Sequence, residues 1–500
     1  MLFVRSLLPS GCRKRKNYYI ESSLLRSGVV AAEKLPKNVV NEILRLSSEN
    51  HDAAAIARAL NLRRLEVVAI LAHRKLQPNS AAAPAEGVEP EPSADFWAES
   101  QSLEAPPPET PSVDLVEVGA RPDERAEGVY LGEDQEFDTA TFWNPTDAQE
   151  VQNPHLMIMG ESGSGKTYAA QCLVAELAQA GLPSIIFDYG QSFEVDKLDP
   201  TFAKYCHPKE YLIGEVGLGL NPFQIFTQDA RGPNTVATRL ADVFDAAYRL
   251  GDIQKKVFID AAVRAYSKAG ILVGDSKTWS RPAPGLSALS ESIEELAADR
   301  EGYPSYRNAA GLGARLTTFF MLVALKDDQW SWDALMNDRT SRVHILQFRG
   351  LEGKTRRVLV ELLLWHMFFY FKSHGQSPLR VFCVLDEAHH LSFREGGPID
   401  ALLREARKFG LGIVFASQQP QDFSPVAYSN TASKLIFQTA DPDLKVSKFL
   451  ASKSTNYADP EEIRQIIASL QQGHAFLITR NRGHSIRVSD FPKRATQWHE

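Results

Sequence analysis

The stretch GESGSGKT, residues Gly160–Thr167, decides the fold of this chain. It matches the pattern G-x-x-x-x-G-K-[ST] in the required context, because the apolar run Leu156–Met159 precedes it and a helical segment follows it. In such a loop the glycines let backbone N–H groups point at phosphate oxygens, and the start of the helix adds its dipole. We predict that nucleotide is bound by Gly160, Glu161, Ser162, Gly163, Ser164, Gly165, Lys166, Thr167 and Tyr168.

Two side chains of this loop have specific expected roles. Lys166 is expected to reach the β- and γ-phosphates of ATP, and Thr167 to hold Mg²⁺. A second Gly-Lys-Thr, residues Gly353–Thr355, also follows an apolar run and opens a helix. Phe348 stands where the first glycine of a phosphate loop is needed, so we interpret Lys354 as a solvated residue at a helix start.

A pair of acids follows another predicted strand. The apolar run Val381–Leu385 ends in Asp386 and Glu387. At the end of a strand, neighbouring side chains can converge on one metal site. We predict that Asp386 holds Mg²⁺, directly or through water, and that Glu387 polarises the attacking water. Without the phosphate loop, the pair would be equally well explained as a cap of the next helix.

Two further groups are candidates for the site. Gln418 follows the predicted strand Gly412–Ala416 and is expected to hydrogen-bond the γ-phosphate or the attacking water; Gln419 and an ordinary polar loop are the alternatives. Before that strand, Arg404, Arg407 and Lys408 stand at i, i+3 and i+4, on one face of a helix. They form either a solvated surface or an arginine finger for a neighbouring subunit's ATP site, with Arg407 preferred to Arg404.

The composition is that of an ordinary globular protein. Hydrophobic residues make up 44% and charged residues 23%, and the net charge of −7 gives no global attraction to nucleic acid. Any DNA-binding cations must therefore be concentrated locally. The cysteines, Cys12, Cys172, Cys206 and Cys383, have neither metal-ligand spacing nor a disulfide pattern, which favours a reducing cytoplasm. No run reaches the roughly 18 apolar residues of a membrane span.

The chain is predicted to divide into a small front module and a large α/β domain. Residues 1–34 carry no clear signal and stay unassigned. Residues 35–78 have apolar residues at helix spacing around a break at Asn61, which resembles a helix-turn-helix; a small helical docking module is the alternative. Residues 79–113, rich in Ala, Pro, Glu and Ser, are predicted to be a flexible linker, and residues 114–500 to be the α/β domain.

Short apolar runs alternate with helical segments through that domain. This alternation predicts a mainly parallel sheet, interrupted at about 230–330 by a mostly helical insertion. The predicted strands are Leu156–Met159, Ser184–Phe187, Val343–Gln347, Val381–Leu385, Gly412–Ala416 and Leu435–Gln438. The predicted helices include Lys166–Ala180, Lys354–Phe371 and Pro398–Lys408.

Taken in order, these elements resemble the HerA/FtsK superfamily of P-loop motor ATPases, from about Val129 to the C-terminus. Besides the phosphate loop, the resemblance is carried by Asn153–His155, Phe187–Asp188, Leu220–Phe223, Asp386–His389, and Arg407–Gly412 leading into Ser417–Gln418. It implies a RecA-like P-loop NTPase core, ATP and Mg²⁺ as cofactors, and a homo-hexameric ring with ATP sites between subunits. In one departure, a helical module on a linker replaces the small β-barrel with which HerA proteins usually begin.

The resemblance is strongest to HerA-type ATPases of mobile elements and anti-phage loci. It implies an ATPase of the DNA translocase or helicase type that moves along duplex DNA and serves a partner nuclease or effector in DNA processing or anti-phage defence. Two other classes stay open: a conjugative or type IV secretion-like ATPase, and a non-translocating ATP switch that gates a partner effector. The helix-turn-helix-like front module favours nucleic acid, and the missing membrane segment disfavours a membrane-anchored coupling role.

Overall fold

The computed structural model describes residues 128–498, apart from 148–150, 217–218, 323–329, 352, 420–421 and 480–481, and also Arg45. Arg45 apart, the predicted front module, its linker and the unassigned first segment lie outside the described residues. The boundaries between these parts and the α/β domain therefore stay predictions.

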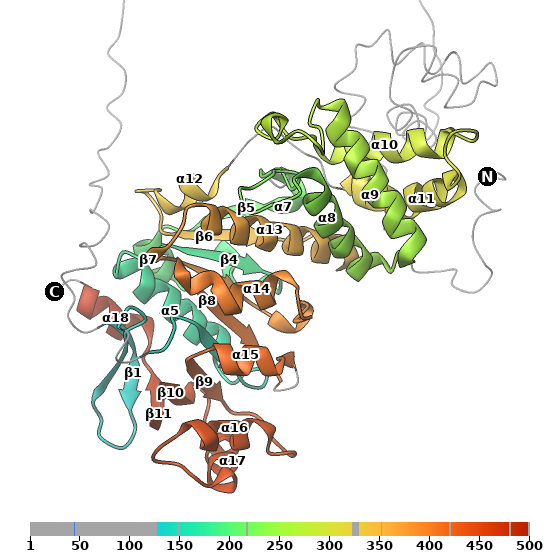
Figure 1. The fold of residues 1–500 in the computed structure, drawn as a ribbon. Coiled ribbons are helices and arrows are strands. Elements are labelled where there is room, and N and C mark those ends of the chain that lie inside the picture. The colour runs from blue at the N-terminus through green and yellow to red at the C-terminus, as the bar shows by residue number, and fades with distance from the viewer. Residues whose placement is uncertain are drawn as a thin grey trace, which may run out of the picture. The chain divides into compact units, whose positions relative to one another are not determined.

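One mixed sheet organises the described residues (Figure 1). Its order is β2-β1-β11-β10-β9-β3-β8-β7-β4-β6-β5. Neighbours from β9 to β5 run parallel, whereas β10, β11, β1 and β2 pair antiparallel. The strands are β1 Val129–Asp134, β2 Ala140–Trp143, β3 Leu156–Met159, β4 Ser184–Asp188, β5 Lys209–Leu212, β6 Val343–Gln347, β7 Ser377–Leu385, β8 Phe409–Ser417, β9 Ser433–Phe437, β10 His474–Thr479 and β11 Arg482–Val488.

Helices cover both faces of the sheet and create two hydrophobic cores. One face carries α5 Lys166–Gln179, α6 Pro200–Cys206 and α18 Phe491–Trp498. The other carries α8 Pro233–Tyr248, α9 Gly251–Lys268, α10 Leu286–Ala298, α11 Tyr306–Leu322, α12 Trp332–Met336, α13 Gly353–Ser373, α14 Pro398–Glu405, α15 Pro425–Asn430, α16 Lys445–Lys453 and α17 Pro460–Ser469. The short α7, Ile213–Val216, follows β5.

The central strand β3 shows how the sequence produces this layering. All its residues are buried, as expected for a parallel strand covered on both faces. Successive side chains alternate between the two cores: Leu156 and Ile158 pack on the α5 side, and Met157 and Met159 on the α13 side. The unbroken apolar run therefore predicted a doubly covered strand correctly.

The predicted helical insertion is confirmed. Helices α8 to α11 lie between β5 and β6 in the chain and gather at one end of the domain, far from α16 and α17 (Figure 1). The motif Leu220–Phe223 anchors them, because the Asn221 side chain donates hydrogen bonds to the carbonyl oxygens of Ala283 and Pro284 at 3.1 and 3.0 Å. His366 of α13 accepts a hydrogen bond from Trp332 of α12, the helix that follows the insertion.

Five strands of the sheet were not predicted from the sequence. β1, β2, β10 and β11 extend the parallel core with an antiparallel edge, and β5 closes the opposite edge. β11 reads RGHSIRV, in which only Ile486 and Val488 are apolar side chains, so it has no clear strand signal of its own. Its pairing with β10 and β1 makes it a strand. β7 and β8 also begin earlier than predicted, because they pair from Ser377 and Phe409 onward.

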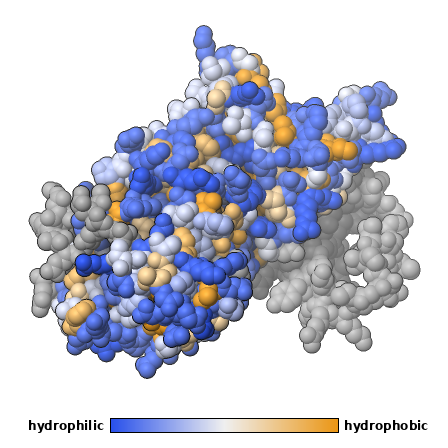
Figure 2. Space-filling view, turned by 60° about the horizontal axis from the view of Figure 1, so that its bottom comes forward, coloured by the Kyte–Doolittle hydropathy of each residue, from blue (hydrophilic) through white to orange (hydrophobic). Residues whose placement is uncertain are grey.

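The surface is predominantly hydrophilic, with apolar side chains scattered in small groups on the face shown in Figure 2. Inside, Cys172, Cys206 and Cys383 are buried free thiols. Within the described ranges, no helix is both long and apolar enough to cross a membrane.

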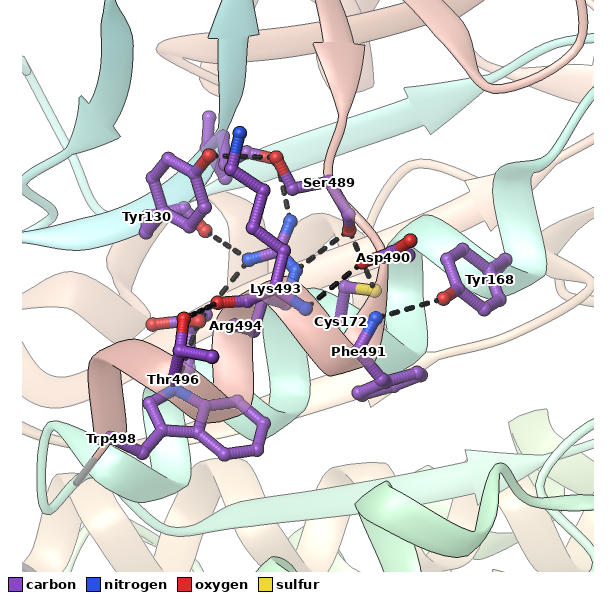
Figure 3. Close-up of polar contacts among 12 residues, drawn as sticks. Tyr130, Tyr168, Cys172, Ser489, Asp490, Phe491, Lys493, Arg494, Thr496 and Trp498 are labelled. Atoms are coloured by element: carbon purple, nitrogen blue, oxygen red, sulfur yellow. Dashed lines mark hydrogen bonds and ion pairs between the residues drawn. The ribbon is translucent and has the colours of Figure 1, made fainter.

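A buried arginine fastens the C-terminal helix α18 to the helix that follows the phosphate loop (Figure 3). Arg494 is 1% exposed and lies 3.2 Å from Glu176 of α5, itself almost fully buried. The guanidinium also donates to the carbonyl oxygens of Tyr130, Leu131 and Ser489 at 2.6 to 2.9 Å. These bonds join β1, α5 and α18 in one polar cluster within the apolar core.

Arg494→Met is expected to lower the free energy of unfolding of the domain by about 3–5 kcal/mol, because Glu176 would keep a buried charge without its cation. Lys493→Met is the matched control, since the neighbouring Lys493 pairs with Glu133 at the surface and should change stability little. Urea unfolding followed by circular dichroism measures both. Equal stability of the two variants would show that the buried pair contributes nothing.

Candidate nucleotide-binding site

The carboxyl edge of the parallel sheet brings most predicted site residues together. β3 runs into the phosphate loop, and its neighbour β8 ends at Ser417, paired with Met159. β7, the next strand, ends directly before Asp386 and Glu387. The strand order β3-β8-β7 thus places the loop, Gln418 and the two acids side by side. Ligand sites of open α/β sheets form at this edge.

The phosphate loop has the backbone geometry that its glycines predicted. Gly160, Gly163 and Gly165 all have positive φ, at 155°, 81° and 110°. A Cβ on Gly160 would lie 2.5 Å from the Cβ of Phe437, so no other residue fits there. Apart from its chain neighbours, no atom of the described residues lies within 4 Å of a Cβ built on Gly163, so that turn of the loop faces open space. Such a cradle suits a phosphate group at the start of α5.

Lys166 lies inside this loop. Its side chain is buried, and Nζ donates a hydrogen bond to the carbonyl oxygen of Glu161 at 2.8 Å. Burial lowers the pKa of Lys166, while Glu387, Asp386 and Glu161 act in the opposite direction. The amine is therefore held where phosphate oxygens would approach, with carboxylates from β7 close enough to influence it.

Some of the other loop residues stabilise the loop through hydrogen bonds, and others have accessible side chains. The Glu161 carboxylate accepts a hydrogen bond from the Ala440 backbone at 2.9 Å, and Ser164 Oγ donates to the Glu161 carbonyl at 2.7 Å. Ser162 is exposed and Thr167 half-buried at the start of α5. Tyr168 points elsewhere: its hydroxyl accepts a hydrogen bond from the Phe491 backbone at 3.0 Å (Figure 3). Its side chain thus supports α18, and its predicted nucleotide contact stays a prediction.

Asp386 fits a metal ligand by its surroundings. Its side chain is 4% exposed, and Oδ2 is buried without a hydrogen-bond partner among the described residues. Burial raises the pKa of Asp386 to about 6, against a hydrogen bond from Ser192 that lowers it. A buried carboxylate with a free oxygen is stabilised by a nearby cation, so Asp386 and Thr167 suit Mg²⁺ together with phosphate oxygens. Neighbouring Asp188 differs, because Ser192, Phe193 and Gln347 all donate hydrogen bonds to it.

Glu387 stands in an unusual backbone conformation. Its φ is 51°, in the left-handed region that non-glycine residues rarely adopt. Gln418 Nε2 donates a hydrogen bond to its Oε2 at 3.1 Å, and His389 Nδ1 lies 3.0 Å from the same oxygen. A Cβ on Gly190 would lie 2.7 Å from Glu387 Cγ. His389 and Gly190 belong to this site by these contacts, although neither was predicted from the sequence as a site residue.

Of the two glutamines, the structure brings Gln418 to the acids. The Gln419 backbone N–H instead donates to Asp422 at 2.9 Å, and Ser417 Oγ donates to the same carboxylate at 2.6 Å. These bonds fix the loop after β8 and leave Gln418 beside Glu387. Its described partner is therefore the predicted base; its predicted contact with the γ-phosphate stays a prediction.

The candidate finger residues lie at the amino ends of the parallel strands, whereas the phosphate loop lies at their carboxyl ends. The helix predicted to reach Lys408 ends at Glu405, and Ala406–Lys408 form a 3₁₀ turn before β8. Arg404, Arg407 and Lys408 are all exposed. Arg404 pairs with Asp400 at 2.7 Å, and Arg407 donates to the carbonyl oxygen of Gln152, in the segment before β3. Neither arginine reaches the phosphate loop of its own chain.

The Asn153–His155 motif aligns β3 with its neighbours. The Asn153 Oδ1 accepts hydrogen bonds from the backbone of His155 and Ala432, at 3.0 and 3.1 Å. His155 is fully buried, and its Nδ1 accepts a hydrogen bond from Ile413 of β8 at 3.1 Å. Burial lowers the pKa of His155 to about 3, which keeps the ring neutral. The motif positions the strand that leads into the loop.

A parallel sheet with a glycine cradle, a buried strand-end aspartate and an adjacent glutamate defines a P-loop ATPase. Residues 144–367 match the family model described as "Helicase HerA, central domain". Together with two curated HerA relatives, this match supports a P-loop ATPase of the HerA/FtsK type.

The comparisons extend this assignment along the chain. The DNA double-strand break repair helicase HerA of Saccharolobus solfataricus is 22% identical over 351 residues, which cover 65% of this chain and 61% of that protein. HerA of Sulfurisphaera tokodaii is 28% identical over 336 residues, covering 65% and 62%. The chain thus spans about three fifths of the length of these curated relatives. The structure of VirB4 of Thermoanaerobacter pseudethanolicus shares the fold, with a TM-score of 0.57, 18% identity, and coverage of 74% and 98%.

Proposed function

We propose that this protein hydrolyses ATP at the edge formed by β3, β8 and β7. Lys166 and the loop amides bind the β- and γ-phosphates, and Thr167 and Asp386 hold Mg²⁺, which neutralises phosphate charge. Glu387 takes the proton of the attacking water as general base. Gln418 hydrogen-bonds both Glu387 and the γ-phosphate, and so fixes the position of the base relative to the bound nucleotide. The side-by-side placement of loop, buried Asp386 and Glu387 carries the proposal.

The energy of hydrolysis is proposed to drive movement along duplex DNA. Support comes from the match to the HerA central domain and from relatives described as DNA double-strand break repair helicases. The likeness to VirB4 is one of fold, and it does not bear on the substrate. We place the protein in DNA processing or anti-phage defence, serving a partner nuclease or effector.

The motor is proposed to be a homo-hexameric ring. Arg407 donates to Gln152 at the amino edge of β3, whereas the phosphate loop lies at the carboxyl edge of the same strand. An arginine at one edge of the sheet acts on ATP only in a neighbouring subunit, which requires subunits packed edge to edge. Its exposure leaves it accessible to such a neighbour. Arg404, tied to Asp400 within its own helix, is the second choice.

Duplex DNA is expected to stimulate ATP turnover more than single strands or RNA of equal length, because the proposed track is the duplex. A third strand annealed to the duplex should be displaced in an ATP-dependent way, which reports translocation, and Glu387→Gln should displace none. Light scattering with ATP and Mg²⁺ measures the ring. If the protein is a monomer and no nucleic acid stimulates its ATP turnover, the proposed DNA motor is contradicted. That result would favour an ATP switch that gates a partner effector.

A further inference from the structure

The two oxygens of the Glu387 carboxylate have different contacts. His389 Nδ1 and Gln418 Nε2 both approach Oε2, at 3.0 and 3.1 Å, whereas the contact of Oε1 within the described part of the chain is a longer one of 3.4 Å with Gln418. A hydrogen bond from Gln418 and the ion-pair contact with His389 meet on one oxygen, and together they hold the carboxylate plane in a single orientation. The other oxygen keeps its capacity to accept a proton.

The ring of His389 is itself supported by a stack of side chains. The ring centroids of His389 and His390 lie 4.0 Å apart, and His390 stacks on Tyr189 at 4.9 Å with an interplanar angle of 16°. Arg356, near the start of α13, lies 4.4 Å from the Tyr189 ring and donates to the Tyr189 carbonyl at 3.1 Å. The stack connects α13 and the end of β4 to the carboxylate of Glu387.

The backbone explains why a residue only two positions later reaches Glu387. The left-handed conformation of Glu387 turns the chain back at the end of β7, and Ala388–His390 continue as a 3₁₀ turn. The side chain of His389 therefore lies next to the carboxylate of Glu387. Gly190 has no Cβ, and this leaves room for Cγ of Glu387 in this conformation.

We propose that His389 is a positioning residue: it holds Oε2 of Glu387 so that Oε1 accepts the proton of the attacking water. The inference rests on the proposed ATP hydrolysis with Glu387 as base. His389 contacts neither nucleotide nor water in this scheme, and it acts only through Glu387. Removing it should therefore slow the chemical step and leave ATP binding alone.

The test compares His389→Leu, which removes the polar contact with Oε2, with His389→Asn, whose side-chain nitrogen can take the place of Nδ1. For His389→Leu we expect kcat to fall by about 10- to 100-fold, the range for residues that orient a reacting group, with KM for ATP little changed. His389→Asn should recover most of the loss. His374→Leu is the control, because His374 is exposed directly after α13, and its hydrogen bonds among the described residues are to Tyr370 and Ser373.

A double-mutant cycle separates positioning from a structural role. In a Glu387→Gln background, His389→Leu should cause no further loss, because its only target is already gone. An undiminished loss there, wild-type or faster turnover of His389→Leu, or failure of His389→Asn to recover activity would each overturn the proposal. Wild-type turnover by Glu387→Gln would instead remove the proposed base together with its positioning residue, so the two failures are distinguishable.

Discussion

Lys166→Ala is expected to abolish ATP hydrolysis, a fall of about 10³-fold or more, and to weaken nucleotide binding. The amine is the one cation inside the glycine cradle among the described residues, and it lies within the field of Asp386 and Glu387. Without it, charge developing on the transferred phosphoryl group loses its nearest protein cation. Turnover is measured by phosphate release, and binding by titration with a fluorescent ATP analogue.

Lys354→Ala is the matched control for Lys166. Lys354 belongs to the second Gly-Lys-Thr and lies 5.6 Å from the ring of Tyr248, outside the glycine cradle. It should therefore leave turnover and binding near wild type. If Lys166→Ala hydrolysed ATP at the normal rate, or if Lys354→Ala lost activity instead, the phosphate loop would be wrongly assigned.

Arg407→Ala is expected to reduce hydrolysis by about 10³-fold or more while ATP binding stays near normal, within the range for arginine fingers. The planar guanidinium stays charged and can contact two phosphate oxygens at once. Among the described residues, Arg407 hydrogen-bonds the Gln152 carbonyl, at the amino ends of the strands and away from the loop, so its loss should not disturb ATP binding within the subunit. Lys408→Ala, the next exposed cation, is the control.

Mixing subunits tests whether the finger acts across an interface. Arg407→Ala subunits have an intact phosphate loop, and Lys166→Ala subunits have an intact arginine, so mixed rings should recover part of the activity. If two inactive variants regain ATP hydrolysis when they are mixed, the active site must combine the phosphate loop of one subunit with the arginine of another. A complete lack of recovery at every ratio, with a monomer by light scattering, would exclude the shared site. Recovery with Arg404→Ala but not with Arg407→Ala would move the finger to Arg404.

The parallel core was predictable because its signal is local. In β3 and β7 an unbroken apolar run is followed at once by a glycine loop or by acids, and burial on both faces requires such a run. The antiparallel edge has no such signal. β11 alternates glycine, polar and charged residues, and its strand structure depends on β10 and β1, which lie elsewhere in the sequence.

The site was predictable in its residues more than in their contacts. Gln418 was expected beside the γ-phosphate, but the strand order also places it against Glu387, which a single sequence does not reveal. His389 was visible only as part of Asp386–His389, because no residue pattern predicts a left-handed glutamate that turns the chain back. Tyr168 follows the loop in sequence, and its partner Phe491 lies 323 positions later.

The Arg494 cluster also sets an order for the assembly of the domain during synthesis. Arg494 and Tyr130 are 364 residues apart, and a ribosome needs on the order of tens of seconds to cover that distance. Until then β1 has no β11 beside it, and Arg494 has not yet been added to pair with Glu176. The contact of Gly473 with Ser164 in the phosphate loop also forms late. The nascent chain therefore holds an incomplete cradle, and its ATPase centre matures only once residues 473–498 have emerged and folded back.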